Sequence, residues 1–253
     1  MQEYEQARQQ MPGIDNWPAE ARLLHGLLYL RGLYPLMPSD WRLWGLRDHP
    51  LPEELFMPAE QDENALIRAE KNEYHATKAM RGLFEIHALV RAYRQGGQHD
   101  LIASLISRHI NQFVRWAEKD SGLFKKRDYV SPVFTIVYTN TQAVGSGQAV
   151  VNKCREVVED YRAEWEERAT ENYPRLITIF VVIQHIVLVF AADTEVGASG
   201  EPFAFAELDM SKKAYWLNTS IAIAIAVMVA RRALVAHRES FAKLEDVEDD
   251  VDL

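Results

Sequence analysis

An apolar run at residues 176–192 constrains the fold more than any other part of this sequence. The run is rich in Ile, Val and Phe, and the polar pair Gln184-His185 interrupts it at its centre. A membrane-spanning helix needs about 20 consecutive apolar residues, whereas β-branched residues favour strands. We therefore expect two buried strands, at residues 175–183 and 186–192, joined by a tight turn.

The segments around this run predict the other elements of the second half. Residues 132–140 and 203–210 have the β-branched and aromatic content of strands. Residues 148–170 carry apolar side chains at helical spacing, and the apolar segment 215–237 contains two arginines near its end, which favours a buried helix. Residues 123–238 are therefore predicted to form a β-α-β-β-β-α core.

The first half of the chain is predicted to be helical. Residues 17–34 form a first helix, with Asn16 as its N-cap. Residues 60–95 and 100–120 carry apolar side chains three and four positions apart, and Gly96-Gly97 separates them. We expect an antiparallel helical hairpin that packs on the strand half. The overall prediction is a mixed α/β (α+β) protein with its helical part at residues 17–122.

A strap at residues 35–58 interrupts the helical part. It holds five of the ten prolines of the chain, together with Trp41 and Trp44. Because exposed tryptophans are costly, we expect packing to order this strap. Two interpretations stay open, namely a cover over the core and a groove in which Trp41 and Trp44 bind a partner.

Charge is distributed unevenly along the 253 residues, whose formal net charge is −9. Residues 239–253 form an acidic tail with seven acidic residues and one lysine, so the remaining body has little electrostatic attraction for nucleic acid. Within the tail, Leu244, Val247 and Val251 would share one stripe of a helix that is too short to form alone. The tail is therefore predicted to become ordered on a protein partner with a basic surface, through these three residues.

The cysteine content and the start of the chain bear on its environment. Cys154 is the one cysteine, which excludes an intrachain disulfide and a multi-cysteine zinc site. Residues 1–16 form a polar, loose start without the apolar core of a secretory signal. We therefore expect an intracellular protein, nuclear or cytoplasmic, that has no membrane span.

A Gly-Ser-Gly sequence at Gly145, Ser146 and Gly147 follows one predicted strand and opens a helix. That arrangement is typical of phosphate-binding βαβ units. However, Val150 occupies the third glycine position, and no acidic residue ends the next strand. We expect a plain loop, and a nucleotide-binding enzyme that uses Gly145–Gly147 remains an alternative.

Two histidines, His87 and His109, lie on the apolar stripes of the two hairpin helices. The hairpin would bring them to the same height, but a metal site usually needs three or four ligands. No acidic residue stands three or four positions away on those stripes. We therefore expect a hydrogen-bonded pair in the core, with no metal and no cofactor.

Three carboxylates, Asp193, Glu207 and Asp209, are the strongest chemical feature of the sequence. With a helix, three strands and a helix around them, they resemble the core of the PD-(D/E)XK nuclease superfamily. The resemblance implies metal-dependent phosphodiester cleavage, with Asp193 at the first acid position and Glu207 to Asp209 at the acid-x-Lys position. Asp209 stands in place of the lysine of that motif, so Lys212 or Lys213 would have to replace it.

The expected strand pairing separates these carboxylates. If the strands at 186–192 and 203–210 form a hairpin, Asp193 pairs near residue 202 and Glu207 lies about 17 Å further along. A shared ion takes its ligands at about 2–2.6 Å. We therefore predict a nuclease-like core without chemistry, which acts as a non-enzymatic protein-interaction module or complex subunit. A metal-dependent nuclease or phosphodiesterase that uses Glu207 and Asp209 is the alternative.

A second resemblance concerns three stretches of the second half. The sequences QHIVLVFAAD, FAFAELDMS and YWLNTSIAIAIAVMVARR are similar to those of uncharacterised proteins of filamentous fungi. This resemblance implies no particular activity.

Overall fold

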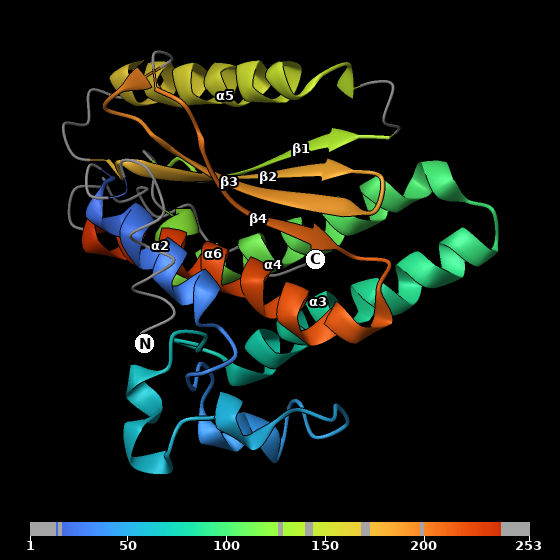
Figure 1. The fold of residues 1–253 in the computed structure, drawn as a ribbon. Coiled ribbons are helices and arrows are strands. Elements are labelled where there is room, and N and C mark those ends of the chain that lie inside the picture. Colours follow the sequence, from blue (N-terminus) through green and yellow to red (C-terminus); the bar gives the residue numbers. More distant parts are fainter. Residues whose placement is uncertain are drawn as a thin grey trace, which may run out of the picture.

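A four-stranded sheet lies at the centre of the computed structural model, which describes residues 14, 17–125, 129–139, 144–167, 173–197 and 200–238 (Figure 1). The strands follow the order β1 (Val133–Tyr138), β2 (Leu176–Ile183), β3 (Ile186–Asp193) and β4 (Phe203–Asp209). β1 and β2 are parallel, and β2–β3 and β3–β4 are antiparallel. The predicted mixed α/β class is therefore confirmed.

The helix α5 (Gly147–Glu167) covers one face of the sheet, above the strands in Figure 1. Parallel neighbours such as β1 and β2 need a crossover connection, and α5 lies in the connection between them. Its buried side chains recur at helical spacing and face one core; they are Val150, Cys154, Val158, Tyr161 and Trp165. Ile177, Ile179 and Val181 of β2 complete this core from the sheet.

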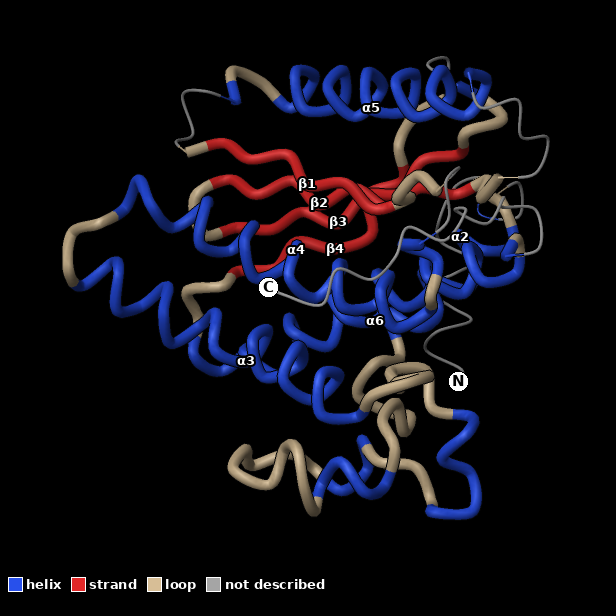
Figure 2. The backbone as a smooth tube through the Cα atoms, turned by 180° about the vertical axis from the view of Figure 1, so that it is seen from behind, coloured by secondary structure: helices blue, strands red, loops and turns tan. Residues whose placement is uncertain are grey.

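Helices α2 (Ala19–Tyr29), α4 (Ile102–Ser121) and α6 (Trp216–Ala236) lie against the opposite face, and Figure 2 shows the same layers from behind. Helix α3 (Glu73–Gln95) packs on α4 and α6, further from the sheet. Phe180 and Val182 of β2 point into this second core, because side chains alternate along a strand. Because β2 is apolar at nearly every position, its side chains supply both cores.

Helix α6 is apolar because it is the central helix of the larger core. Every residue from 221 to 230 is buried, and α6 contacts α2, α3, α4 and β2. Among the described residues, the segment Lys213–Ala236 is one helix long and apolar enough to cross a membrane, and 78% of its apolar window is buried inside the molecule. Core helices of this composition pass the same test, so composition alone does not indicate a membrane.

The helical hairpin begins later than the sequence predicts. The expected helix at 60–95 is divided, with a 3-10 turn at Ala59–Asn64 and α3 starting at Glu73. Asn72 caps α3, since its side chain accepts a hydrogen bond from the backbone N–H of His75 at 3.1 Å. At the other end, Gly97 has a φ of 72°, which suits glycine and allows the tight connection to α4.

The strap is anchored in the larger core by six buried side chains: Leu36, Met37, Trp41, Leu46, Leu55 and Phe56. Two 3-10 turns, Ser39–Arg42 and Glu53–Leu55, shape it. Packing covers Trp41 but not Trp44, which is 74% exposed, so the expectation that both tryptophans are covered is wrong for Trp44. The predicted N-cap Asn16 and the acidic tail at 239–253 lie outside the described residues.

Candidate functional site

The structure places two of the candidate catalytic carboxylates at opposite ends of β3. Asp193 pairs with Leu176, and Arg175 donates to both of its oxygens at 2.9 and 2.6 Å. Asp209 pairs with Ile186, seven residues away along β3, which corresponds to about 23 Å at the rise of a strand. The two carboxylates therefore share no ion.

Asp209 has a local structural role at the end of β4. The hydroxyl and the backbone N–H of Ser211 donate to its Oδ1 at 2.6 and 2.9 Å. Burial opposes ionisation of Asp209, but these hydrogen bonds, with the charges of His185 and Lys212, hold its pKa below the usual value. The Lys212 ammonium lies 3.6 Å from the Asp209 carboxylate. Glu207 is exposed on the edge strand opposite Leu188.

The two core histidines contact different elements. His87 Nε2 lies 2.6 Å from the hydroxyl of Thr219 on α6, and burial lowers the pKa of His87 to about 4. His109 packs against Gly82 on α3, and burial lowers its pKa as well. No hydrogen bond joins the two imidazoles, so the expected pair does not form. Across the described ranges, no group of three or more His, Cys, Asp or Glu side chains is placed to hold a metal.

The Gly-Ser-Gly sequence forms the start of α5. Gly145 has a φ of 68°, and Ser146 Oγ accepts a hydrogen bond from the backbone N–H of Ala149 at 3.3 Å. Ser146 therefore caps the helix, as serine commonly does. Gly145, Ser146 and Gly147 are all exposed.

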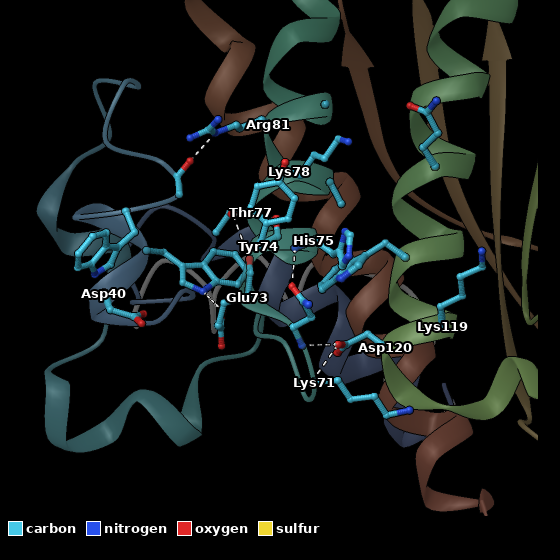
Figure 3. A pocket seen from close by; sticks show the side chains of 18 of the residues that line it. Asp40, Lys71, Glu73, Tyr74, His75, Thr77, Lys78, Arg81, Lys119 and Asp120 are labelled. Atoms are coloured by element: carbon cyan, nitrogen blue, oxygen red, sulfur yellow. Dashed lines mark hydrogen bonds between the residues drawn. The ribbon is translucent and has the colours of Figure 1, made fainter. Parts of the chain in front are cut away.

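A groove of ≈ 1370 Å³ lies between the strap and the helical hairpin (Figure 3). Strap residues 40–48 form one side, the first turns of α3 form its floor, and α4 forms the other side. A pocket that encloses a drug-sized molecule typically has about 300–1,000 Å³. The size and the open form of this groove therefore suit a segment of polypeptide better than a small molecule.

Two exposed aromatic side chains line the groove. Trp44 on the strap is 74% exposed and Tyr74 on α3 is 68% exposed. Trp41 is buried beside them, and its indole N–H donates to the Glu73 carboxylate. Tryptophan and tyrosine are enriched among the residues that dominate binding energy at protein interfaces. Trp41 therefore holds the strap to α3, whereas Trp44 is available for contact.

Three lysines, Lys71, Lys78 and Lys119, also line the groove and are exposed. No carboxylate within the described ranges forms an ion pair with any of them. Lys71 Nζ lies beside Gly122 at the end of α4, and Lys119 Nζ is 5.6 Å from the centroid of the Phe124 ring. The floor and the α4 side of the groove therefore carry positive charge that the described part of the chain does not neutralise by ion pairing.

Carboxylates also line the groove, and several of them are engaged. Asp48 lies 3.7 Å from Arg47, and Glu73 accepts from Trp41. Asp40 lies on the strap side, whereas Lys119 lies on the α4 side (Figure 3). Glu85 is exposed further along α3. The strap side of the groove therefore carries Asp40 and the Arg47–Asp48 pair, whereas the basic side, beside α4, carries Lys71 and Lys119.

Asp120 holds in place the backbone that carries the basic side of the groove. Its carboxylate accepts hydrogen bonds from the backbone N–H groups of Glu70, Lys71 and Asn72 at 2.6, 3.0 and 3.3 Å. Arg231 of α6 donates to the same carboxylate at 2.9 Å. These bonds fix the backbone that leads into α3 and therefore fix where Lys71 and Tyr74 enter the groove.

Only part of the groove could be predicted from the sequence. Trp41 and Trp44 are predicted as partner-binding residues from their position in the strap, and both line it. The three lysines are isolated in the sequence, and no local pattern connects Lys71 and Lys78 with Lys119, which is about forty positions further on. The candidates Leu244, Val247 and Val251 lie outside the described residues.

Comparisons with protein-family models, with curated proteins and with solved structures found no match to this chain.

Proposed function

We propose that this protein is a non-enzymatic interaction module or complex subunit, and that its groove binds an acidic segment of a partner protein. The segment also carries a large apolar or aromatic side chain. One observation carries the proposal, namely that exposed Trp44 and Tyr74 share a groove with three exposed lysines.

The aromatic residues supply the contact area. Buried tryptophan and tyrosine side chains dominate the energy of many interfaces, because they remove a large apolar area from water. Binding through Trp44 costs little backbone entropy, since its neighbours Trp41 and Leu46 are buried and hold the strap in place. An apolar side chain of the partner is therefore expected to pack between Trp44 and Tyr74.

The lysines supply selectivity for charge. The whole chain has a net charge of −9 and repels acidic polypeptides in general, so a local basic surface is the place where such a segment binds. Lys71 and Lys119 stand on the α4 side, opposite Asp40 on the strap (Figure 3). This asymmetry favours one orientation of the bound segment.

The two enzymatic alternatives gain no supporting observation from the described residues. The nuclease alternative needs Glu207 and Asp209 near a third ligand, whereas Asp193 is at the far end of β3. The nucleotide-binding alternative needs the Gly145–Gly147 turn to receive a phosphate, whereas Ser146 caps α5. A partner with a basic surface and an intracellular location remain predictions.

The test uses a fluorescein-labelled ten-residue peptide that contains six Asp or Glu residues and one Trp. We expect the protein to bind this peptide in preference to a peptide of the same length in which Lys replaces each acid. Trp44→Ala should weaken binding at least ~10-fold, because truncating an aromatic hot-spot residue costs about 2 kcal/mol or more. Fluorescence anisotropy at low salt measures these affinities.

Matched controls separate the groove from the rest of the surface. Leu43→Ala removes an adjacent side chain that is 62% exposed and does not line the groove, so binding should be unchanged. Lys71→Glu with Lys119→Glu should weaken binding, whereas Lys153→Glu on α5 should not. Three outcomes would overturn the proposal: a preference for the basic peptide, binding that the groove variants do not change, and absence of binding both by the full chain and by a chain that ends at Lys243.

A further inference from the structure

The described chain ends beside the basic side of the groove. Helix α6 finishes at Ala236, and the Arg238 guanidinium donates to the Ser121 carbonyl at 2.9 Å and to the Glu70 carboxylate at 3.0 Å. Glu70 directly precedes Lys71, and Ser121 lies two residues after Lys119 on α4. The two hydrogen bonds of Arg238 therefore place the start of the C-terminal segment close to Lys71 and Lys119.

The C-terminal segment has the composition that the groove is proposed to bind. Residues 244–253, LEDVEDDVDL, contain six acidic residues and no basic residue, with Leu and Val between the acids. Six steps of extended chain from Arg238 to Leu244 span up to about 20 Å, and ten further residues span up to about 35 Å. The segment is therefore long enough to enter the groove of its own molecule.

We infer that residues 244–253 of this chain bind the Lys71, Lys78 and Lys119 side of the groove and compete with an acidic partner. The inference rests on the proposed function. A tether of a few residues gives an effective concentration of the order of mM, so even a weak intramolecular contact is populated. The tail then acts as a built-in competitor that a partner has to displace.

The test compares three proteins with the same labelled acidic peptide as probe. They are the full chain, a chain that ends at Lys243, and a full-length variant in which Asn or Gln replaces the six acids of residues 244–253. We expect the truncated and the neutralised proteins to bind the probe at least ~10-fold more tightly than the full chain at low salt. The difference should shrink at high salt, because salt screens the interaction.

The failure of this inference differs from the failure of the proposed function. Equal affinities in all three proteins, with binding that still depends on Trp44, would overturn the tail inference alone. Absence of Trp44-dependent binding even in the truncated chain would overturn the proposed function. The neutralised variant keeps the test valid if truncation impairs folding.

Two further outcomes bear on the same inference. Weaker binding of the probe after truncation would overturn it, because the tail would then assist binding. An intramolecular competitor predicts a gain that does not depend on protein concentration. A gain that grows with protein concentration would overturn it in favour of the tail of a second copy.

Discussion

At the scale of single residues, Asp120 connects three segments that are far apart in the sequence. It accepts hydrogen bonds from the backbone at residues 70–72 and from Arg231, and its side chain is almost fully buried. Arg231 also contacts Glu70 at 3.0 Å and the Arg68 carbonyl at 3.1 Å. A buried charge network of this kind costs little when complete and much when one member is missing.

Asp120→Ala is expected to reduce the free energy of unfolding by about 3–5 kcal/mol, because it leaves Arg231 buried without its closest carboxylate. Urea denaturation followed by circular dichroism measures the change. Asp100→Ala serves as the control, since Asp100 is exposed at the start of the α4 region, and it should change stability by less than ~1 kcal/mol. Equal effects of the two variants would contradict the role assigned to Asp120.

At the scale of elements, α6 is a helix whose small residues allow close packing on all sides. Ala222, Ala224 and Ala226 are fully buried and alternate with Ile and Val. The hydroxyl of Thr219 donates to the Tyr215 carbonyl, one turn earlier in the chain. Ser220 Oγ donates to the Leu83 carbonyl of α3 at 3.0 Å and so joins the two helices. The alternating sequence resembles a strand, but burial on every side of a helix removes the need for a polar face.

Ala224→Leu is expected to destabilise the protein by about 1–3 kcal/mol, because a larger side chain cannot enter a closely packed core without displacing its neighbours. The matched control is Ala236→Leu at the exposed end of the same helix, which should change stability by less than ~0.5 kcal/mol. Thermal unfolding measures both. A comparable loss for the two variants would show that α6 is not packed on all sides.

In the whole molecule, the two cores lie on opposite faces of one sheet, and several histidines are buried or half-buried. Burial is the largest cause that lowers the pKa of five of them: His25, His49, His87, His109 and His185. The unfolded chain binds protons at these sites near pH 6.5, whereas the folded chain binds them at lower pH. Their contribution to stability is therefore present above pH 6.5 and is lost as the pH falls.

Stability is accordingly expected to decrease between pH 6.5 and about 4, the pKa of buried His87. His87 alone accounts for on the order of 2–3 kcal/mol of this loss. His87→Gln should make the decrease less steep, because glutamine does not titrate, while His75→Gln at an exposed position should leave it unchanged. Urea denaturation at a series of pH values tests this. A slope that His87→Gln does not alter would contradict the assignment.

Elements with a local signal could be predicted from the amino-acid sequence alone. The apolar run at 176–192 predicts β2 and β3, because its β-branched content and the polar pair Gln184-His185 at its centre are local signals. Gly96-Gly97 marks the connection of the hairpin because glycine tolerates the positive φ that Gly97 adopts. The fold class could therefore be predicted correctly.

Features that depend on contacts between distant residues could not be predicted in this way and are visible only in the folded chain. Helix α3 starts at Glu73 and not near residue 60. The backbone N–H groups of residues 70–72, just before the helix, donate hydrogen bonds to Asp120, which is about fifty positions away in the sequence. The groove forms where Trp44, Tyr74 and Lys119 converge from three elements. The periodicity of apolar residues shows which face of a helix or strand is buried. It does not show which other element covers that face, because this depends on packing between segments that are far apart in the sequence.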